Sequence, residues 1–349
     1  MRILIEPNDV LLFRESKPFM AGEGHLARSV FPLPQVIAGA IRSKILIDSN
    51  FSNDAKKLVG FGKDKPEFTI LGHFLFKDEE FFATPLDIAT AKGVEGYFFV
   101  KPLKIWNGRF IFSGKHIHFK SVGGYLSCKH LINYLKCDLN ENELEDIIRD
   151  DLFTRESRIG IKLGDAKVTE EGYFYKAEFL RLNKGVRLSV WLDDGCEDVR
   201  AFLGEDGLIK LGGESRFAKF KFENKNPLSK LEEVWDEIKE EINRKKKFKL
   251  YVATPLLVKN NNSYTWDIKA PLEKELNILI KNVYPLIGKP LTFSGWDYAE
   301  NKPKPNRYAV SQGSVYFVEF KGKIEHNKPY LKLGELMKLG YGLCFMGVW

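Results

Sequence analysis

Basic side chains stand beside a glycine pair in the middle of the 349-residue sequence. Arg216 follows Gly212 and Gly213, and Lys219 and Lys221 continue at alternate positions. Alternate residues of a strand project to one face, and glycine lets a ligand approach the backbone closely. A basic strip beside an exposed backbone is typical of surfaces that follow the phosphates of a nucleic acid. A bulge flanked by solvated lysines would use the same residues, so both interpretations stand.

A second glycine pair encloses an aromatic residue in Gly340-Tyr341-Gly342. Two glycines there would let backbone N–H groups reach a phosphate, while the Tyr341 ring would offer a stacking surface to a base. A tight turn that needs positive φ is the alternative. We predict residues 301–308 to be a rigid basic loop, in which Lys304 suits a phosphate and Tyr308 a base. An ordinary exposed loop has the same composition.

Histidines give little support for catalysis. His25 lies in a glycine-rich stretch and His73 in a strand-like run, and neither has an acidic residue at the spacing of a metal-binding helix. The sequence contains no GxSxG, P-loop or HExxH pattern. A zinc cluster is conceivable, but its residues fit no standard spacing: His116, His118, Cys128, His130 and Cys137. We therefore predict no catalytic residue, no metal site and no cofactor.

The bulk composition favours a protein with a polyanionic partner. Fifty-four Lys and Arg against forty-seven Asp and Glu give a net charge of +7, although many proteins this basic bind no nucleic acid. The four scattered cysteines predict neither a disulfide framework nor a zinc ribbon, which favours the cytoplasm. No apolar run approaches the roughly 18–20 residues that span a bilayer, so we expect no membrane association.

The elements that must position these residues follow from periodicity. Residues 2–5 are typical of a buried strand, and residues 14–32 are too polar and glycine-rich to pack. Pro34, followed by isoleucines at every fourth position, predicts a helix over 34–47. Further predictions are a hairpin of 68–76 with 80–84, a helix at 141–152, a hairpin of 172–182 with 186–192, a helix at 198–203 and a strand ending at Phe222.

Beyond a break at Pro227, apolar residues at alternating three- and four-residue steps predict a long helix from Leu228 through Ile242. Predicted next are a strand at 248–253, a helix at 272–283, strands at 291–294 and 314–320, a helix at 332–339 and a strand at 343–348. This order is βαββαβ, and the first half repeats it with an insertion over about 85–170. The sequence thus predicts an α+β fold of two tandem ferredoxin-like, RRM-related modules, residues 1–224 and 225–349.

Several segments, taken in order, resemble a Cmr-type member of the RAMP superfamily, the third-named subunit of the type III-B CRISPR effector complex. They span nearly the whole chain, with Glu15-Ser16 and Leu33 departing from the usual pattern. The segments are Phe13 to Phe19, Ser29 to Pro34 running into Ala38 to Arg42, Arg158 to Ile161, Leu211 to Arg216, Ser294 to Asp297, Pro303 to Pro305, Gly313 to Phe317 and Gly340 to Leu343.

The resemblance implies two ferredoxin-like domains and a subunit without nuclease activity that binds the 5′ tag of the guide RNA. It also implies docking against the large polymerase/cyclase-like subunit and a backbone subunit. Together with the residue patterns it gives a predicted RNA-binding set of Arg14, Lys17, Arg28, Ser29, Arg42, Arg158, Gly212, Gly213, Arg216, Lys304, Tyr308, Gly340, Tyr341 and Gly342.

Two other functions remain open at this point. Related RAMP proteins cleave guide precursors without metal through a histidine that acts as general acid or base, and His25 would be the candidate here. A scaffold that contacts only protein would instead turn the basic loops toward an acidic partner surface.

Overall fold

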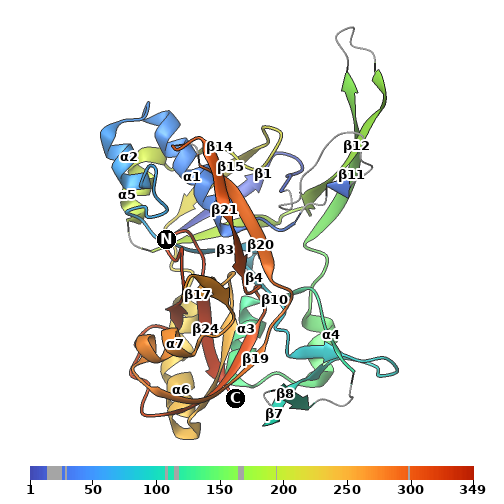
Figure 1. Cartoon of the computed structure of the whole chain (residues 1–349), viewed down its shortest axis with the longest axis vertical. Coiled ribbons are helices and arrows are strands. Elements are labelled where there is room, and N and C mark those ends of the chain that lie inside the picture. Colours follow the sequence, from blue (N-terminus) through green and yellow to red (C-terminus); the bar gives the residue numbers. More distant parts are fainter. Residues whose placement is uncertain are drawn as a thin grey trace.

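The computed structural model describes residues 1–13, 26–27, 30–106, 109–113, 118–163, 169–193, 195–297 and 299–349. It is a mixed α and β structure with several antiparallel sheets. The two largest sheets lie one above the other along the long axis, each with its own helices (Figure 1). We call these halves the N-terminal and the C-terminal module. In the described residues no helix is long and apolar enough to cross a membrane.

The N-terminal module contains a seven-stranded sheet in the order β10-β4-β3-β13-β1-β15-β14. Its strands are β1 (Arg2–Pro7), β3 (Ile70–Lys77), β4 (Glu79–Ala83), β10 (Tyr125–Ser127), β13 (Arg187–Leu192), β14 (Asp206–Lys210) and β15 (Phe217–Glu223). Helices α1 (Pro34–Asp48), α2 (Asn53–Val59) and α5 (Cys196–Leu203) share one core with this sheet. The predicted helix over 34–47 is confirmed, because Ile37, Ile41 and Ile45 are all fully buried.

Two predictions for this half are wrong in their pairing or length. The predicted hairpin of 172–182 with 186–192 does not form, because β12 (Thr169–Leu182) pairs with β11 (Phe153–Leu163) while β13 pairs with β1 and β3. Alternation shows which face of a strand is buried, but it does not specify the neighbouring strand. In place of the predicted helix at 141–152 the structure has a short 3-10 helix, η1 (Glu141–Glu143), followed by one turn of α-helix, α4 (Leu144–Ile147). The helix does not continue because the backbone of Arg149 pairs with Tyr125 instead.

The segment between β4 and β13 adds smaller elements around this sheet. A three-stranded sheet joins β5 (Ile88–Thr90), β6 (Phe98–Phe99) and β9 (Lys120–Ser121), and β7 (Lys101–Trp106) pairs with β8 (Arg109–Ser113). Helix α3 (Cys128–Lys136) packs against the C-terminal module at β24 and α6. Strands β11 and β12 form a long ribbon that leaves the body of the molecule, and β2 (Leu26–Ala27) lies along it (Figure 1).

The C-terminal module contains a five-stranded sheet in the order β19-β22-β16-β24-β23. Helices α6 (Ser229–Lys245) and α7 (Lys269–Leu276) bury their apolar residues in its core. The strands are β16 (Lys247–Val252), β19 (Leu279–Leu286), β22 (Val315–Lys321), β23 (Tyr330–Lys332) and β24 (Leu343–Val348), with a small ribbon of β17 (Val258–Asn260) and β18 (Ser263–Thr265) beside them. Between β19 and β22, the ribbon of β20 (Leu291–Asp297) and β21 (Lys302–Ala309) reaches up to the N-terminal module (Figure 1).

Three predictions in this half need correction. The predicted helix at 332–339 is absent, because Leu333 N–H bonds to Gly342 and the Lys338 carbonyl accepts from Ile70 of the other module. The predicted helix at 272–283 ends at Leu276, where Asn277 takes a left-handed φ of 51°. The segment predicted as a loop at 301–308 belongs to strand β21.

Lys332 lies at the junction between the modules, and its burial leads us to expect a stability that depends on pH. Its ammonium on β23 donates to the carbonyls of Ile70 and Leu71 on the N-terminal sheet, at 3.3 and 3.2 Å. Burial lowers the pKa of Lys332 to about 7. Between that pKa and the usual lysine value the unfolded chain holds the extra proton, so this group makes stability rise with pH. Between pH 7 and 9 we expect urea unfolding to show roughly 1 kcal/mol per pH unit from this residue.

The matching variant is Lys332→Met, which keeps the length of the side chain and removes the titrating group. Its unfolding free energy should rise less between pH 7 and 9 than that of the parent. Equal pH profiles for the two proteins would show that Lys332 titrates normally in the folded chain.

Candidate nucleic-acid interface

Three arginines from separate segments meet around Asp9, which follows strand β1. Arg158 on β11 and Arg216 before β15 both reach Asp9 Oδ2 at 3.4 Å, and Arg181 on β12 reaches Oδ1 at 3.1 Å. The guanidinium groups of Arg158 and Arg216 both lie over the buried Phe179 ring, 5.2 and 5.1 Å from its centroid. The fold thus brings together two residues of the predicted set, and adds Arg181. We call Arg158, Arg181 and Arg216 the arginine cluster.

Acidic partners orient this cluster without covering it. Glu156 accepts from both Arg158 and Arg181 at 2.7 Å, and these hydrogen bonds hold the pKa of Glu156 below its usual value. Burial raises the pKa of Asp9, but Arg158 and Arg181 outweigh that effect, so the net shift is downward. The three arginine side chains remain 26–42% exposed. Planar guanidinium groups held in this way are suited to phosphate oxygens.

Gly212 and Gly213 lie beside the arginine cluster, but their backbone serves the fold. Gly213 N–H donates to the Leu12 carbonyl at 2.8 Å, so it is not the free phosphate donor that we predicted. A Cβ on Gly212, whose φ is +84°, would lie 2.7 Å from the same carbonyl oxygen. One residue further, Phe13 accepts from Val30 N–H at 3.0 Å. The glycine pair therefore packs where the chain enters residues 14–29, and the predicted Arg14, Lys17, Arg28 and Ser29 lie outside the described residues.

Gly340, Tyr341 and Gly342 are packing residues, which corrects their predicted contact with RNA. Tyr341 is fully buried and its ring stacks on Phe293 at 5.3 Å, so neither face is open to a base. Gly342 N–H donates to the Pro255 carbonyl at 2.9 Å, and Gly340 N–H donates to Met337 at 3.4 Å. Both glycines have positive φ, as the alternative of a tight turn required.

Arg42 also has a structural position. Its Nε donates to the Val59 carbonyl, and its Nη2 donates to the carbonyls of Gly60 and Lys63. These carbonyls lie at the end of α2 and just after it, where a helix has no internal donors left. Burial lowers the pKa of Arg42. Its predicted phosphate contact is corrected, because these donors cap a helix.

The ribbon of β20 and β21 carries the remaining predicted residues. Lys304 and Arg307 both bind Asp64 of the N-terminal module, at 2.6 and 3.0 Å. Lys304 therefore fastens the ribbon in place. Tyr308 is 48% exposed and meets Tyr264 edge to face, and Trp296 on β20 is 49% exposed. Exposed aromatic side chains on a fixed ribbon are suited to stacking on bases. The stacking role of Tyr308 stays a prediction.

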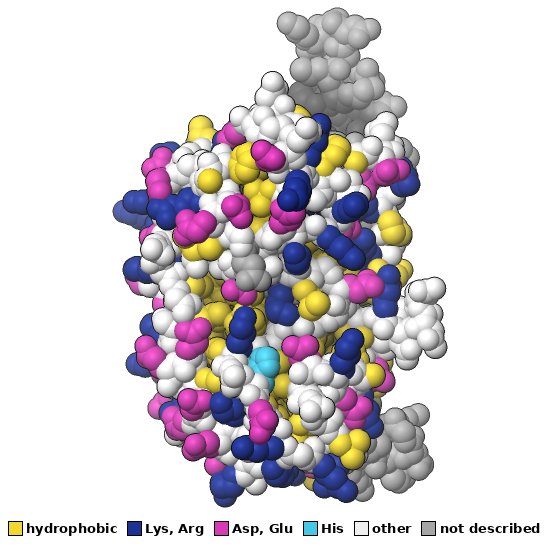
Figure 2. Space-filling view, turned by 90° about the vertical axis from the view of Figure 1, so that its left-hand side faces the viewer, with side chains coloured by type: hydrophobic (Ala, Val, Ile, Leu, Met, Phe, Trp, Pro, Cys, Tyr) yellow, Lys and Arg dark blue, Asp and Glu magenta, His cyan; other side chains and the backbone are white. Residues whose placement is uncertain are grey.

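The described residues offer no group of three or more His, Cys, Asp or Glu side chains that could hold a metal ion. His25 and His116 lie outside the described residues, and His118 is exposed. His73 is buried, and burial lowers its pKa to about 4. Figure 2 shows basic and acidic side chains interspersed over the face that carries α2 and α5, which is typical of a solvated surface.

The family model described as CRISPR-associated protein (Cas_Cmr3) matches residues 3–349. Among curated proteins, none matches the chain. Two solved structures are similar in fold at 19% identity, with 91% of this chain and 86% of the other covered. One is a chain of the type III-B Cmr-beta complex bound to cognate target RNA and AMPPnP, with a TM-score of 0.54. The other comes from Cmr-beta bound to cognate target RNA, with a TM-score of 0.55.

Proposed function

The chain belongs to the CRISPR-associated Cas_Cmr3 family, and we propose that it is a non-catalytic subunit of a type III-B CRISPR effector complex that binds the 5′ tag of the guide RNA. The similar chains come from type III-B Cmr-beta complexes bound to RNA. The same proposal includes docking to the large polymerase/cyclase-like subunit and to a backbone subunit, in the cytoplasm. It rests on the family and on the arginine cluster.

The strand orders support the tandem ferredoxin-like architecture as part of this proposal. In the N-terminal sheet β15-β1-β13-β3, and in the C-terminal sheet β24-β16-β22-β19, the four strands have the relative order 4-1-3-2. The N-terminal module supplies α1 and α5 as the two crossover helices. In the C-terminal module α7 is the first crossover helix, and α6, which precedes the sheet, covers it together with α7.

The arginine cluster is the observation that carries RNA binding. Its three guanidinium groups come from the body and the ribbon of the N-terminal module, and the Phe179 ring under two of them shares a small core with Leu12. Arginine side chains that are partly exposed and already oriented lose little entropy when they bind phosphate. Contacts to phosphates position a nucleic acid without reading it, so recognition of a tag also needs contacts to bases.

Competition between two guide RNAs tests the proposed function. The purified complex is reconstituted with a guide RNA that carries its natural 5′ tag, or with one whose tag is replaced by an unrelated sequence of equal length. We expect the tagged guide to bind at least tenfold more tightly, and ultraviolet crosslinks from its 5′ end to map to this subunit. Equal affinities, or crosslinks confined to other subunits, would contradict the proposal. Guide cleavage in the presence of a chelator would contradict the non-catalytic assignment.

A further inference from the structure

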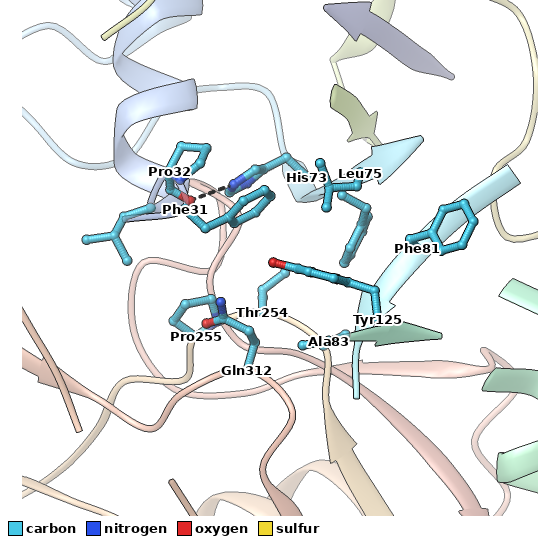
Figure 3. A pocket seen from close by; sticks show the side chains of 13 residues that line it. Phe31, Pro32, His73, Leu75, Phe81, Ala83, Tyr125, Thr254, Pro255 and Gln312 are labelled. Carbon is cyan, nitrogen blue, oxygen red and sulfur yellow. Dashed lines mark hydrogen bonds between the residues drawn. The ribbon is translucent and has the colours of Figure 1, made fainter. Parts of the chain in front are cut away.

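A cavity lies where helix α3 and the strands beside it meet the C-terminal sheet, apart from the pocket at the junction of the two modules. The junction pocket, between His73 and Gln312 (Figure 3), has a volume of only about 30 Å³, which holds about two water molecules. The cavity at α3 measures about 150 Å³. An engineered apolar cavity of that size binds benzene, so the cavity at α3 has room for a small organic molecule.

Aromatic side chains line this cavity from two sides. Phe99 on β6 stacks near Tyr134 of α3, with ring centroids 6.3 Å apart and 29° between the planes. On the side of the C-terminal sheet, Phe317 on β22 meets Trp349 with ring centroids 5.3 Å apart. Flat, apolar walls of this kind suit a ligand with an aromatic ring. We call this space the aromatic cavity.

Lys249 on β16 brings a buried positive charge to the aromatic cavity. Only 5% of the residue is exposed, and its Nζ lies 3.6 Å from the centroid of the Tyr134 ring. Nζ donates no hydrogen bond to a described residue and forms no ion pair with one. Because Nζ is nevertheless not fully enclosed, it is open to the cavity that Lys249 lines. Buried lysines are normally paired, so this ammonium is suited to bind an anion.

Asp87 does not supply that anion. Both of its carboxylate oxygens lie within hydrogen-bond distance of the Tyr134 hydroxyl, at 2.8 and 2.9 Å, and it forms no ion pair with Lys249. Burial lowers the pKa of Lys249, and the charge of Asp87 offsets that effect only in part. Burial raises the pKa of Asp87 to about 6, so this carboxyl is mostly ionised at pH 7. The charged side chains that line the cavity are therefore Lys101, Lys249 and Asp87, an excess of one positive charge that a monoanion would balance.

We propose that the aromatic cavity binds one small organic carboxylate with an aromatic ring, of the size of benzoate. The carboxylate accepts from Lys249 Nζ, and the ring lies between the aromatic walls. A dianion such as phosphate binds less well, because it would bring a second negative charge close to Asp87 and make no use of the apolar walls. The aromatic cavity shares no residue with the arginine cluster, and this inference does not rest on the proposed function.

The experiment titrates the full chain with three probes: benzoate, benzyl alcohol, which has the ring without the charge, and inorganic phosphate, which has the charge without the ring. Methyl NMR spectra report binding at Leu139 and Val348, which line the cavity. The charge variant is Lys249→Met, which keeps the length of the side chain. Lys259→Met on β17 is the matched control, because it removes the same charge from an exposed ion pair with Glu335. Thermal melting verifies folding of both variants.

We expect benzoate to bind the parent and Lys259→Met with a dissociation constant of about 1 mM, as is usual for a ligand of about nine heavy atoms. Benzyl alcohol and phosphate should each bind about tenfold more weakly or worse. In Lys249→Met, benzoate should bind only as weakly as benzyl alcohol does.

The parent alone is enough to overturn the proposal, whether or not the variants fold. If the methyl signals of Leu139 and Val348 did not move at about ten times the expected dissociation constant, water alone would occupy the cavity. Equal binding of benzoate and benzyl alcohol would exclude a role for the charge of Lys249, and equal binding of benzoate and phosphate would exclude a role for the aromatic walls. A Lys249→Met variant that folds and keeps the preference for benzoate would also contradict the proposal.

Discussion

Replacing Arg158, Arg181 and Arg216 together with alanine is expected to weaken binding of the guide RNA by on the order of a hundredfold at low salt. The three side chains share Asp9 and Glu156, so removal of one leaves the others held near the same place. Each single variant should therefore lower the logarithm of the RNA affinity by less than a third of the decrease in the triple variant. The triple variant removes the whole site.

A salt series separates lost phosphate contacts from misfolding. Each phosphate contact to a single strand contributes about 0.7 to the slope of log affinity against log salt, so the triple variant should have a slope smaller by about 2. The control is the triple variant of Arg149, Arg200 and Arg244, which are ion-paired with Asp151, Glu205 and Glu241 and lie away from the cluster. Both triple variants change the net charge equally. If they lose equal affinity, only the overall charge matters and the arginine cluster is not the binding site.

Gly342→Ala is expected to destabilise the chain by about 3 kcal/mol or more. Gly342 has a φ of +71°, and a Cβ there would lie 1.9 Å from the carbonyl oxygen of Leu333. That carbonyl belongs to the backbone that runs from β23 to the other module, so it has little freedom to move away. Urea unfolding, followed by circular dichroism, measures the loss as a lower midpoint at an unchanged slope.

Gly39→Ala is the matched control for this prediction. Gly39 lies inside α1, and a Cβ there would meet nothing within 4 Å. Alanine at an open helical position should raise stability by about 0.5–1 kcal/mol. If Gly342→Ala kept the stability of the parent and lost RNA binding instead, the original prediction of a phosphate contact at this glycine would be restored.

The sequence predicted elements well where one periodicity extended over a whole element, and poorly where pairing decided the structure. Helix α1 and the β3–β4 hairpin were predictable from local patterns. The helix has isoleucine at every fourth position, and the hairpin has a short polar turn between two apolar strands. Residues 332–339 have helical spacing, yet their backbone groups bond to Gly342 and Ile70. Neither the contact of Leu333 with Gly342, nine positions away, nor that of Lys338 with Ile70 in the other module leaves a periodic pattern, so this segment was predicted as a helix.

The candidate site was predictable in residue type and only in part in position. Arg158 and Arg216 were singled out by the motifs around them, and the fold brings both to Asp9. Arg181 was missed because β12 was predicted to pair with β13, which hid its position across the ribbon from Thr154. Arg42 and Tyr341 were predicted from motif membership, and burial explains why those residues serve the fold instead. That His73 Nδ1 has no hydrogen-bond partner among the described residues is visible only in three dimensions.

The position of β24 in the C-terminal sheet sets an order of events during synthesis. This strand lies between β16 and β23, yet the ribosome makes it after both, and after α6. Until β24 is synthesised, the sheet that the apolar face of α6 packs against is incomplete. All strands of the N-terminal sheet have been made by then and can already be paired. Nascent chains should therefore acquire protease resistance in two steps, first in the N-terminal module and then in the C-terminal module, whose apolar surface stays exposed until β24 is made.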